Sequence, residues 1–244
     1  MKTINIHGID IKLTKERADL LIGGWEFARV QSMLLNIKEG DTIFDIGAEQ
    51  GDITALLAKK AKGKTVAFEP SPVMWPHIKS NFENNGLKLD GYHCGFASDV
   101  TEMNPKNLNY DDTDKNGYPL LAYEKKADVR AFRHLDEEAS ATRQITLDDY
   151  CKEHNIYPNL ITIDVEGSEY NVMKGAMEVL NTSMPLVYIS VHYDFMYTKF
   201  KKHFNDLYHD TFEKAGYKMK FLGQDHEAHF VFYKKSILEI REIL

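Results

Sequence analysis

The sequence has few cysteines, no long hydrophobic run and no excess of positive charge, and each absence argues against a class of protein. Its two cysteines, Cys94 and Cys151, lie far apart without metal-ligand spacing, which fits packed or free thiols in a reducing compartment. The longest apolar runs are as short as residues 186–189, so no transmembrane helix is predicted. A formal charge of −7 argues against general binding to nucleic acid, because a phosphate backbone requires a cationic surface.

The amino terminus has no apolar stretch and no cleavage site of the kind found in signal peptides, so we expect a cytoplasmic protein away from any membrane. The 244 residues are 43% hydrophobic and 11% aromatic, which is enough to fill a sizeable core and argues against disorder. The sequence shows no internal repeat. Length alone leaves open one large domain or two small ones.

Apolar runs alternate with amphipathic runs along most of the chain, which is typical of a sheet covered by helices. The strands that this alternation predicts are 42–47, 65–68, 92–94, 160–165, 185–191, 218–222 and 230–233. The predicted helices are 18–36, 52–61, 71–86, 146–150, 168–180 and 198–215. Pro76 lies awkwardly inside the third of these helices, and the last two strands are expected to form an antiparallel hairpin.

Two stretches differ from this alternation. Residues 1–40 are expected to form an extension, with a small hairpin that turns at Gly8 and a helix broken at two adjacent glycines. Residues 100–143 are polar, acidic and rich in turn residues, and have too few apolar side chains to bury a core alone. We therefore interpret 100–143 as an insertion, with a short strand near 129–132, and expect a single domain over 1–244.

An acidic glycine turn follows the first strand of the alternating part and precedes a helix. It contains Asp45, Gly47 and Gly51, at a strand end of the kind where doubly wound sheets bind their ligands. The spacing differs from the G-x-G-x-x-G of dinucleotide-binding proteins, and the carboxylate of Asp45 would repel a pyrophosphate but attract a sulfonium or an amine. A tight turn without a ligand is the alternative.

Glu69 ends the second strand of this part, roughly 20 residues beyond the glycine turn, where an acid can accept both ribose hydroxyls of an adenosine. The alternative is a solvated carboxylate that only caps the helix beginning at Ser71. Because the glycine turn with Asp45 lies upstream at the expected distance, we favour the ribose role for Glu69.

Two later strand ends carry further polar residues. Asp164 and Glu166 flank Val165, so both can point to the same side of their strand, where two carboxylates can share a proton, bind a cation or orient a hydroxyl. His192 ends the next strand and could remove a proton from a hydroxyl if the two strands are neighbours. Packing or hydrogen bonding is an equally supported role for His192. For Glu169, a favourable interaction with the helix N-terminus is the expected role.

Weaker signals lie near both ends of the chain. Trp25 and Glu26 could close over a ligand, although a core position is favoured for Trp25. In the terminal hairpin, His226, Glu227 and His229 could reach a substrate or a metal, although a solvated turn is favoured there.

These segments together resemble the FkbM family of class I S-adenosylmethionine-dependent methyltransferases. The matching segments are GDTIFDIGAEQGDITALLA, VAFEPSP, GFASD, ITLDDY and LITIDVEGSEYNVMKGAMEVL followed by PLVYISVH. The DVEG-x-E segment is the most specific of them. Glu49 departs from the family pattern and adds an acid beside the expected cofactor.

The resemblance implies an α/β, Rossmann-like three-layer sandwich whose mostly parallel seven-stranded sheet contains one antiparallel strand. It also implies S-adenosyl-L-methionine as the cofactor, with Asp45, Gly47 and Gly51 at its methionine end and Glu69 on its ribose. The remaining cofactor residues that it implies are Phe96, Ala97 and Ser98 near the adenine, and Asp164 at the methyl-transfer end.

The resemblance further implies an O-methyltransferase that acts on a hydroxyl of a sugar, a glycan or a small natural product. We predict that Asp164, Glu166 and His192 orient or deprotonate this hydroxyl. A divalent cation on Asp164 and Glu166 is not expected, because oxygen ligands alone are weak evidence for a metal. An inactive cofactor-binding scaffold or regulatory module is the alternative function, while the glycine spacing disfavours a nicotinamide oxidoreductase.

Overall fold

A computed structural model of the chain describes residues 1–71, 74–102 and 144–234. The expected insertion at 100–143 therefore lies outside the described residues apart from its first three, and so does the strand expected near 129–132.

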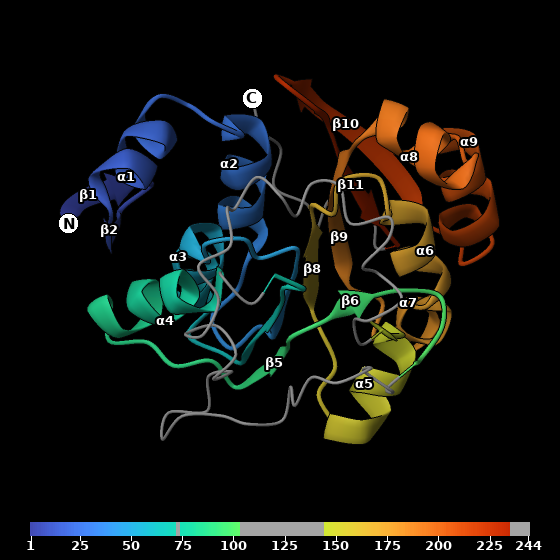
Figure 1. The fold of residues 1–244 in the computed structure, drawn as a ribbon, viewed down its shortest axis with the longest axis horizontal. Helices are drawn as coiled ribbons and strands as arrows, with labels where there is room; N and C mark the ends of the chain where they lie inside the picture. The colour runs from blue at the N-terminus through green and yellow to red at the C-terminus, as the bar shows by residue number, and fades with distance from the viewer. Residues whose placement is uncertain (72–73, 103–143, 235–244) are drawn as a thin grey trace.

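A seven-stranded sheet forms the middle layer of the molecule (Figure 1). Its strands, in spatial order, are β10 (Lys218–Gln224), β11 (Ala228–Tyr233), β9 (Leu186–Val191), β8 (Leu160–Ile163), β3 (Ile43–Ile46), β4 (Thr65–Phe68) and β5 (Gly91–His93). The five strands from β9 to β5 are parallel, and β11 runs antiparallel to both of its neighbours. The predicted sheet, with a single antiparallel strand, is confirmed.

The central strands are short apolar runs because helices cover both of their faces. Every residue of β3, β4 and β8 is buried, as expected for parallel strands inside a three-layer fold. The helices on one face are α2 (Phe27–Asn36), α3 (Asp52–Ala61) and α4 (Trp75–Asn84), and their core includes Leu56 and Trp75. The helices on the other face include α5 (Leu147–His154), α6 (Glu169–Lys174) and α7 (Met177–Thr182), and their core includes Phe44, Tyr150 and Phe212.

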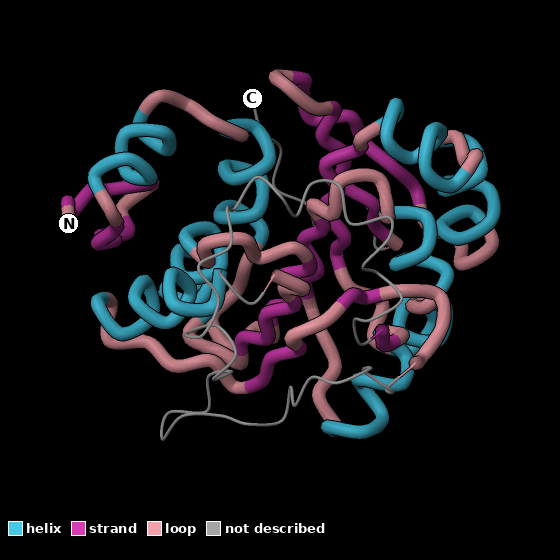
Figure 2. The backbone as a smooth tube through the Cα atoms, viewed as in Figure 1, coloured by secondary structure: helices cyan, strands magenta, loops and turns pink. Residues whose placement is uncertain are grey.

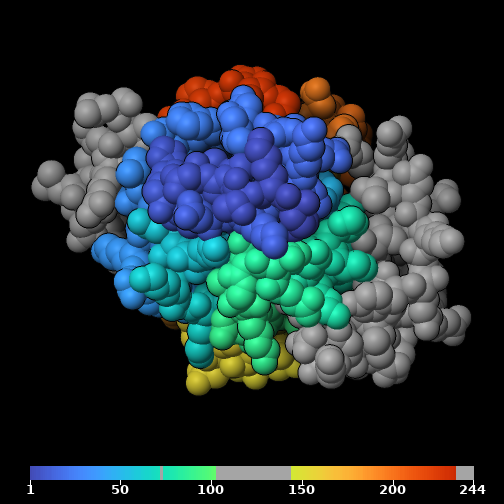
Figure 3. Space-filling model, turned by 90° about the vertical axis from the view of Figure 1, so that its left-hand side faces the viewer, coloured from blue at the N-terminus to red at the C-terminus, as the bar shows by residue number. Residues whose placement is uncertain are grey.

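The N-terminal segment packs against the first face as an added layer (Figures 2 and 3). Its hairpin, β1 (Lys2–Ile6) and β2 (Ile9–Leu13), turns at His7 and Gly8 as predicted and is followed by α1 (Lys15–Ile22). Lys12 exchanges two backbone hydrogen bonds with the side chain of Asn85, which ties the hairpin to the end of α4. In Figure 3 this dark blue segment lies at the surface and borders the cyan and green part of the chain.

Several helix boundaries differ from the prediction. The helix expected at 168–180 is two helices, because the chain breaks at Gly175, where an added Cβ would lie 1.9 Å from the carbonyl oxygen of Ser98. The helix expected at 198–215 is also divided: α8 (Tyr193–Phe200) ends at Lys201, and α9 (Phe204–Leu207) continues into a π-helical turn. Pro76 lies in the first turn of α4, where its missing N–H costs no hydrogen bond.

The carboxyl ends of β3, β4, β8 and β9 lie at the same edge of the sheet, because these strands are parallel and in register. A short parallel pair, β6 (Phe96–Ala97) and β7 (Gln144–Ile145), forms a separate two-stranded sheet. Within the described residues, no helix has both the length and the apolar character needed to cross a membrane.

Candidate active site

A cavity of about 670 Å³ opens at this edge of the sheet. Its lining includes most of the residues predicted to bind a cofactor, namely Asp45, Gly47, Glu69, Phe96, Ala97, Ser98 and Asp164. Glu166 also lines it. Gly51 does not: it begins α3 with a φ of 74°, and an added Cβ would lie 3.1 Å from Ile78, so it serves the turn itself. The structure therefore brings distant sequence segments together around one space.

Asp45 lies at the end of β3 with its side chain buried. The hydroxyl of Thr54 donates a hydrogen bond of 2.5 Å to Asp45 Oδ2, and burial raises the pKa of Asp45 to about 6. Gly47, two residues later, has a φ of 85°, and an added Cβ would lie 1.9 Å from the carbonyl oxygen of Asp164. Glycine at this position lets the turn after β3 lie directly against the end of β8.

Glu69 is buried where β4 ends, and each of its carboxylate oxygens accepts a backbone hydrogen bond. The N–H of Ser71 lies 2.8 Å from Oε1, and the N–H of Glu49 lies 2.9 Å from Oε2. Burial raises the pKa of Glu69 to about 8, although these two hydrogen bonds act in the opposite direction. When Glu69 is ionised, each oxygen keeps a further lone pair with which to accept a hydroxyl.

Arg17, from α1, neutralises the acids of the glycine turn. Its guanidinium makes a bidentate pair with Asp52, both hydrogen bonds being 3.0 Å long, and Nη2 lies 3.0 Å from the carboxylate of Glu49. The same guanidinium lies 4.7 Å from the ring centre of Trp25. The extra acid that Glu49 adds to the turn therefore has a partner, which sequence analysis missed because α1 is remote in the sequence.

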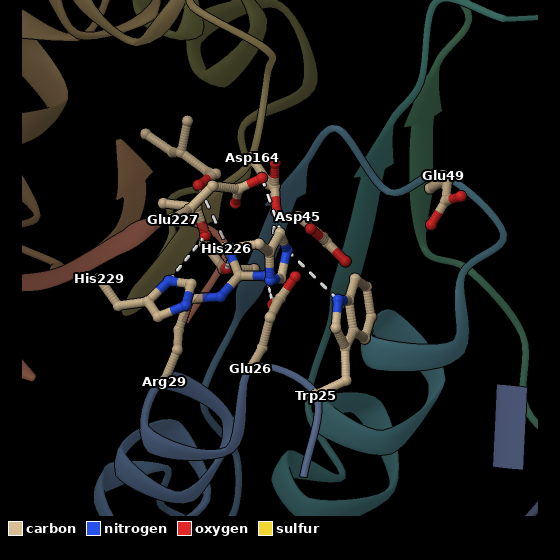
Figure 4. Close-up of polar contacts among 12 residues, drawn as sticks. Trp25, Glu26, Arg29, Asp45, Glu49, Asp164, His226, Glu227 and His229 are labelled. Atoms are coloured by element: carbon tan, nitrogen blue, oxygen red, sulfur yellow. Dashed lines mark hydrogen bonds and ion pairs between the residues drawn. The ribbon is translucent and has the colours of Figure 1, made fainter. Parts of the chain in front are cut away.

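Arg29, from α2, neutralises a second acidic group, around Asp164 (Figure 4). Its guanidinium is buried, forms an ion pair with Glu26, lies 3.3 Å from Asp164 Oδ2 and donates to the hydroxyl of Thr162. Burial alone would lower the pKa of Arg29. The carboxylates of Glu26 and Asp164 have the larger combined effect, so the pKa of Arg29 is raised. Burial also raises the pKa of Asp164 well above its ordinary value, against the opposing effect of Arg29.

His192 lies beside Asp164 and Glu166, because β8 and β9 are neighbours as expected. Its Nε2 is 3.7 Å from a carboxylate oxygen of each. Its Nδ1 is hydrogen-bonded at 2.7 Å to Glu169, whose carboxylate is fully buried and also accepts the N–H of Gly167. Glu169 thus does more than interact with the N-terminus of α6: it fixes the orientation of the imidazole.

The terminal hairpin supplies the fourth acid of this group. Glu227 lies in the turn between β10 and β11 with its side chain 15% exposed, and its Oε1 is 2.8 Å from His192 Nε2. Burial would lower the pKa of His192, but the nearby carboxylates of Glu169 and Glu227 outweigh it and raise the pKa to about 11. The expectation of a solvated turn is wrong for Glu227, because β11 pairs with β9 and brings the turn over its end.

The rest of this turn contacts the N-terminal segment. The ring of His226 stacks on Trp25, with ring centres 5.9 Å apart, and accepts a hydrogen bond from the indole N–H (Figure 4). The carboxylate of Asp225 accepts the backbone N–H of Glu26 and is paired with His229. Trp25 is therefore a half-buried residue of the cavity wall, where a core position was favoured.

Comparisons with known proteins identify a family and show similar folds among solved structures. Residues 45–219 match the family model described as the methyltransferase FkbM domain. The solved structure of a methyltransferase FkbM from Methylobacillus flagellatus KT is 14% identical with a TM-score of 0.52, over 88% of this chain and 60% of that one. A ribosomal protein L11 methylase from Lactobacillus delbrueckii subsp. bulgaricus is 10% identical with a TM-score of 0.50, over 86% and 78% of the two chains.

The search of curated proteins finds no match. At these identities the two structures show a likeness of fold alone. The chain also spans 60% of the length of the Methylobacillus protein, so that protein has further residues to which nothing in this chain corresponds.

Proposed function

Because the chain belongs to the FkbM methyltransferase family, we propose that it transfers a methyl group from S-adenosylmethionine to a hydroxyl of a sugar, a glycan or a small natural product. The observation that carries this proposal is the gathering of Asp45, Glu69, Asp164 and Glu166 in one cavity at the carboxyl ends of three parallel strands. Ligands of doubly wound sheets bind at this edge.

The residues of the cavity fit this cofactor in size and in charge. A space of about 670 Å³ lies within the range of small-molecule sites. Among the described residues that line it, eight are carboxylates and only three are arginine or lysine. Such an excess of negative charge favours a ligand that carries a sulfonium and an amine, and disfavours the pyrophosphate of a nicotinamide dinucleotide.

Each cofactor residue has a role that its position supports. The two oxygens of Glu69, already oriented by backbone N–H groups, would accept the two ribose hydroxyls. Asp45 would receive the amine of the methionine part, and the chain at Phe96, Ala97 and Ser98 would border the adenine. Asp164 would lie nearest the sulfonium, which supplies an electrophilic methyl group when the cofactor is bound.

The acceptor hydroxyl is a weak nucleophile at neutral pH, so the site needs groups that orient it and take its proton. Asp164 and Glu166 would orient it through their carboxylates. The carboxylates of Glu169 and Glu227 raise the pKa of His192 and so favour its protonated form. A cationic sulfonium nearby would lower that pKa, which frees Nε2 to accept the proton while Glu169 holds Nδ1. The attack itself depends mainly on positioning.

The experiment that tests this function is a transfer assay with methyl-labelled S-adenosylmethionine over a panel of glycans and small hydroxyl compounds. We expect label in at least one acceptor as a methyl ether, and less of that label at limiting cofactor concentration when Asp45 is changed to Asn. Cofactor binding by calorimetry without transfer to any acceptor would favour the alternative, an inactive scaffold or regulatory module. Binding of NAD in place of S-adenosylmethionine would contradict both.

A further inference from the structure

The side chains of Asp164, His192 and Glu227 converge at the edge of the cavity, which Asp164 and Glu227 line. We propose that Asp164, His192 and Glu227 form a divalent-cation site next to the methyl-transfer position, where the cation binds the acceptor hydroxyl. This rests on the proposed function for its role in catalysis but not for the binding of the ion. One donor atom from each residue lies within 4.8 Å of the other two. A cation with ligands at about 2.0–2.2 Å requires spacings of this order.

The imidazole of His192 has the character of a metal ligand. Its residue is only 7% exposed, and its Nε2 is buried and makes no hydrogen bond of acceptable geometry with any described residue, although Glu227 Oε1 is 2.8 Å away. Its other nitrogen is bound at 2.7 Å to the buried carboxylate of Glu169. A histidine held by a carboxylate on one nitrogen, with the other aimed at acids, is the usual arrangement around a bound metal.

Neighbouring residues also hold the two residues that would supply carboxylate ligands. Arg29 contacts Oδ2 of Asp164, while the oxygen on the His192 side is Oδ1. The backbone N–H of Glu227 donates to Asp225, which His229 and the N–H of Glu26 hold in turn. Oε2 of Glu227 is buried without a hydrogen-bond partner among the described residues. The donor atoms therefore need little rearrangement to receive an ion.

A second trio, Glu26, His226 and Glu227, shares one of these ligands but fits an ion less well. Glu26 is already paired with the buried Arg29. His226 stacks on Trp25, and 44% of its side chain is exposed. The trio with His192 is therefore the one that we assign.

The donor set selects the class of metal. One imidazole with two carboxylates suits Mn²⁺, Fe²⁺ or Zn²⁺ better than Mg²⁺ or Ca²⁺, which prefer oxygen ligands alone. Three protein ligands leave coordination positions open toward the cavity, where a hydroxyl oxygen can bind and lose its proton more readily. With the ion on Nε2 of His192, Glu166 becomes the carboxylate that accepts this proton. The new oxygen–carbon bond then forms as the carbon–sulfur bond of the sulfonium breaks.

The test is a titration of chelator-treated protein with Mn²⁺ alone, followed through the electron paramagnetic resonance signal of free Mn²⁺. We expect one bound ion per chain, and an affinity at least tenfold weaker in Glu227→Gln and Asp164→Asn. Glu166→Gln is the matched control, because it removes the same charge 3.7 Å from His192 without removing a proposed ligand, and should bind within about threefold of wild type. Thermal melting of each variant shows that it is folded.

Equal affinity in wild type and Glu227→Gln, or no binding at all, would overturn the site. The transfer assay separates this outcome from failure of the proposed function. If methyl transfer continues at full rate in excess chelator, the proposed role of the cation is wrong and the proposed function stands. If Mn²⁺ binds and Glu227→Gln weakens that binding, but the protein transfers no methyl group, the cation site stands and the proposed function is wrong.

Discussion

The two ends of the cavity are built in different ways. The proposed cofactor end, where β3 and β4 finish, holds Glu69 with backbone N–H groups, and one of those groups belongs to a residue only two positions away. The proposed acceptor end, where β8 and β9 finish, holds His192 with carboxylates of Glu169 and Glu227, and Asp164 with Arg29. Backbone groups of two turns thus orient Glu69, whereas side chains from remote elements orient His192 and Asp164.

This difference predicts unequal sensitivity to mutation, and Arg29 offers the largest effect. In Arg29→Met, the carboxylates of Glu26 and Asp164 lose their buried partner, and we expect the free energy of unfolding to fall by about 3–5 kcal/mol. Urea denaturation measures this. The exposed Lys62, paired with Glu39 at 3.4 Å, is the control, and Lys62→Met should cost less than about 1 kcal/mol. If the two variants lose similar amounts of unfolding free energy, the buried ion pairs of Arg29 do not stabilise this end of the cavity more than an exposed ion pair would.

The second prediction concerns turnover. His192→Ala should lower the rate of methyl transfer by about 100-fold, because the hydroxyl loses the group that orients it or takes its proton. Its affinity for S-adenosylmethionine should stay within about threefold of wild type, since His192 is not among the residues proposed to bind the cofactor. Single-turnover rates and calorimetry measure the two quantities separately. Wild-type turnover would remove His192 from the catalytic group.

A third, smaller effect tests the cofactor end alone. Asp45→Asn should weaken cofactor binding about tenfold, or about 1.4 kcal/mol, because a neutral amide attracts the cationic ligand less. The melting temperature should change little, since Thr54 can still donate its hydrogen bond. Glu49→Gln is the control, because Arg17 already neutralises Glu49. If calorimetry gives the same affinity for Asp45→Asn and wild type, the assignment of Asp45 to the cofactor is wrong.

The smallest effect is a dependence of stability on pH. Glu69 has an ordinary pKa of 4.5 in the unfolded chain and about 8 in the fold, so between these values the folded protein holds a proton that the unfolded chain has released. Its contribution to stability is complete below pH 4.5 and is lost as the pH rises through 8. Glu69→Gln should therefore lose less stability than wild type between pH 5 and 8, by about 1 kcal/mol or more. Parallel melting curves of the two proteins across that range would argue against the raised pKa.

The difference between local and remote contacts also explains which features could be predicted from the sequence. The order of strands and helices and the placement of Asp45 and Glu69 at strand ends follow from local patterns, and the structure has them there. Partners from remote elements were missed: Arg17 and Arg29 show no local signal, because their roles depend on how α1 and α2 pack. Glu227 was named as a possible contact of a substrate or a metal, but a solvated turn was favoured, because local sequence does not show that the hairpin turn lies over the end of β9.

The predicted helix boundaries that were wrong have a similar cause. Gly175 interrupts α6 and α7 because Ser98, from another part of the fold, approaches its Cα too closely for a side chain. Lys201 ends α8 in a left-handed conformation, although the apolar spacing runs on past it. Periodicity describes which face of a helix is buried, but tertiary contacts decide where the helix stops.

The contact of Trp25 and Glu26 with His226 and Asp225 also sets an order of events during protein synthesis. The two pairs lie about 200 positions apart, and the second belongs to the last hairpin of the described chain. A ribosome-bound chain that ends before residue 225 already contains the glycine turn and Glu69, but it has no Asp225 or His226 to contact Glu26 and Trp25 and no Glu227 beside His192. The turn after β3 is therefore synthesised early, whereas the opposite wall of the cavity is complete only once this hairpin has been translated.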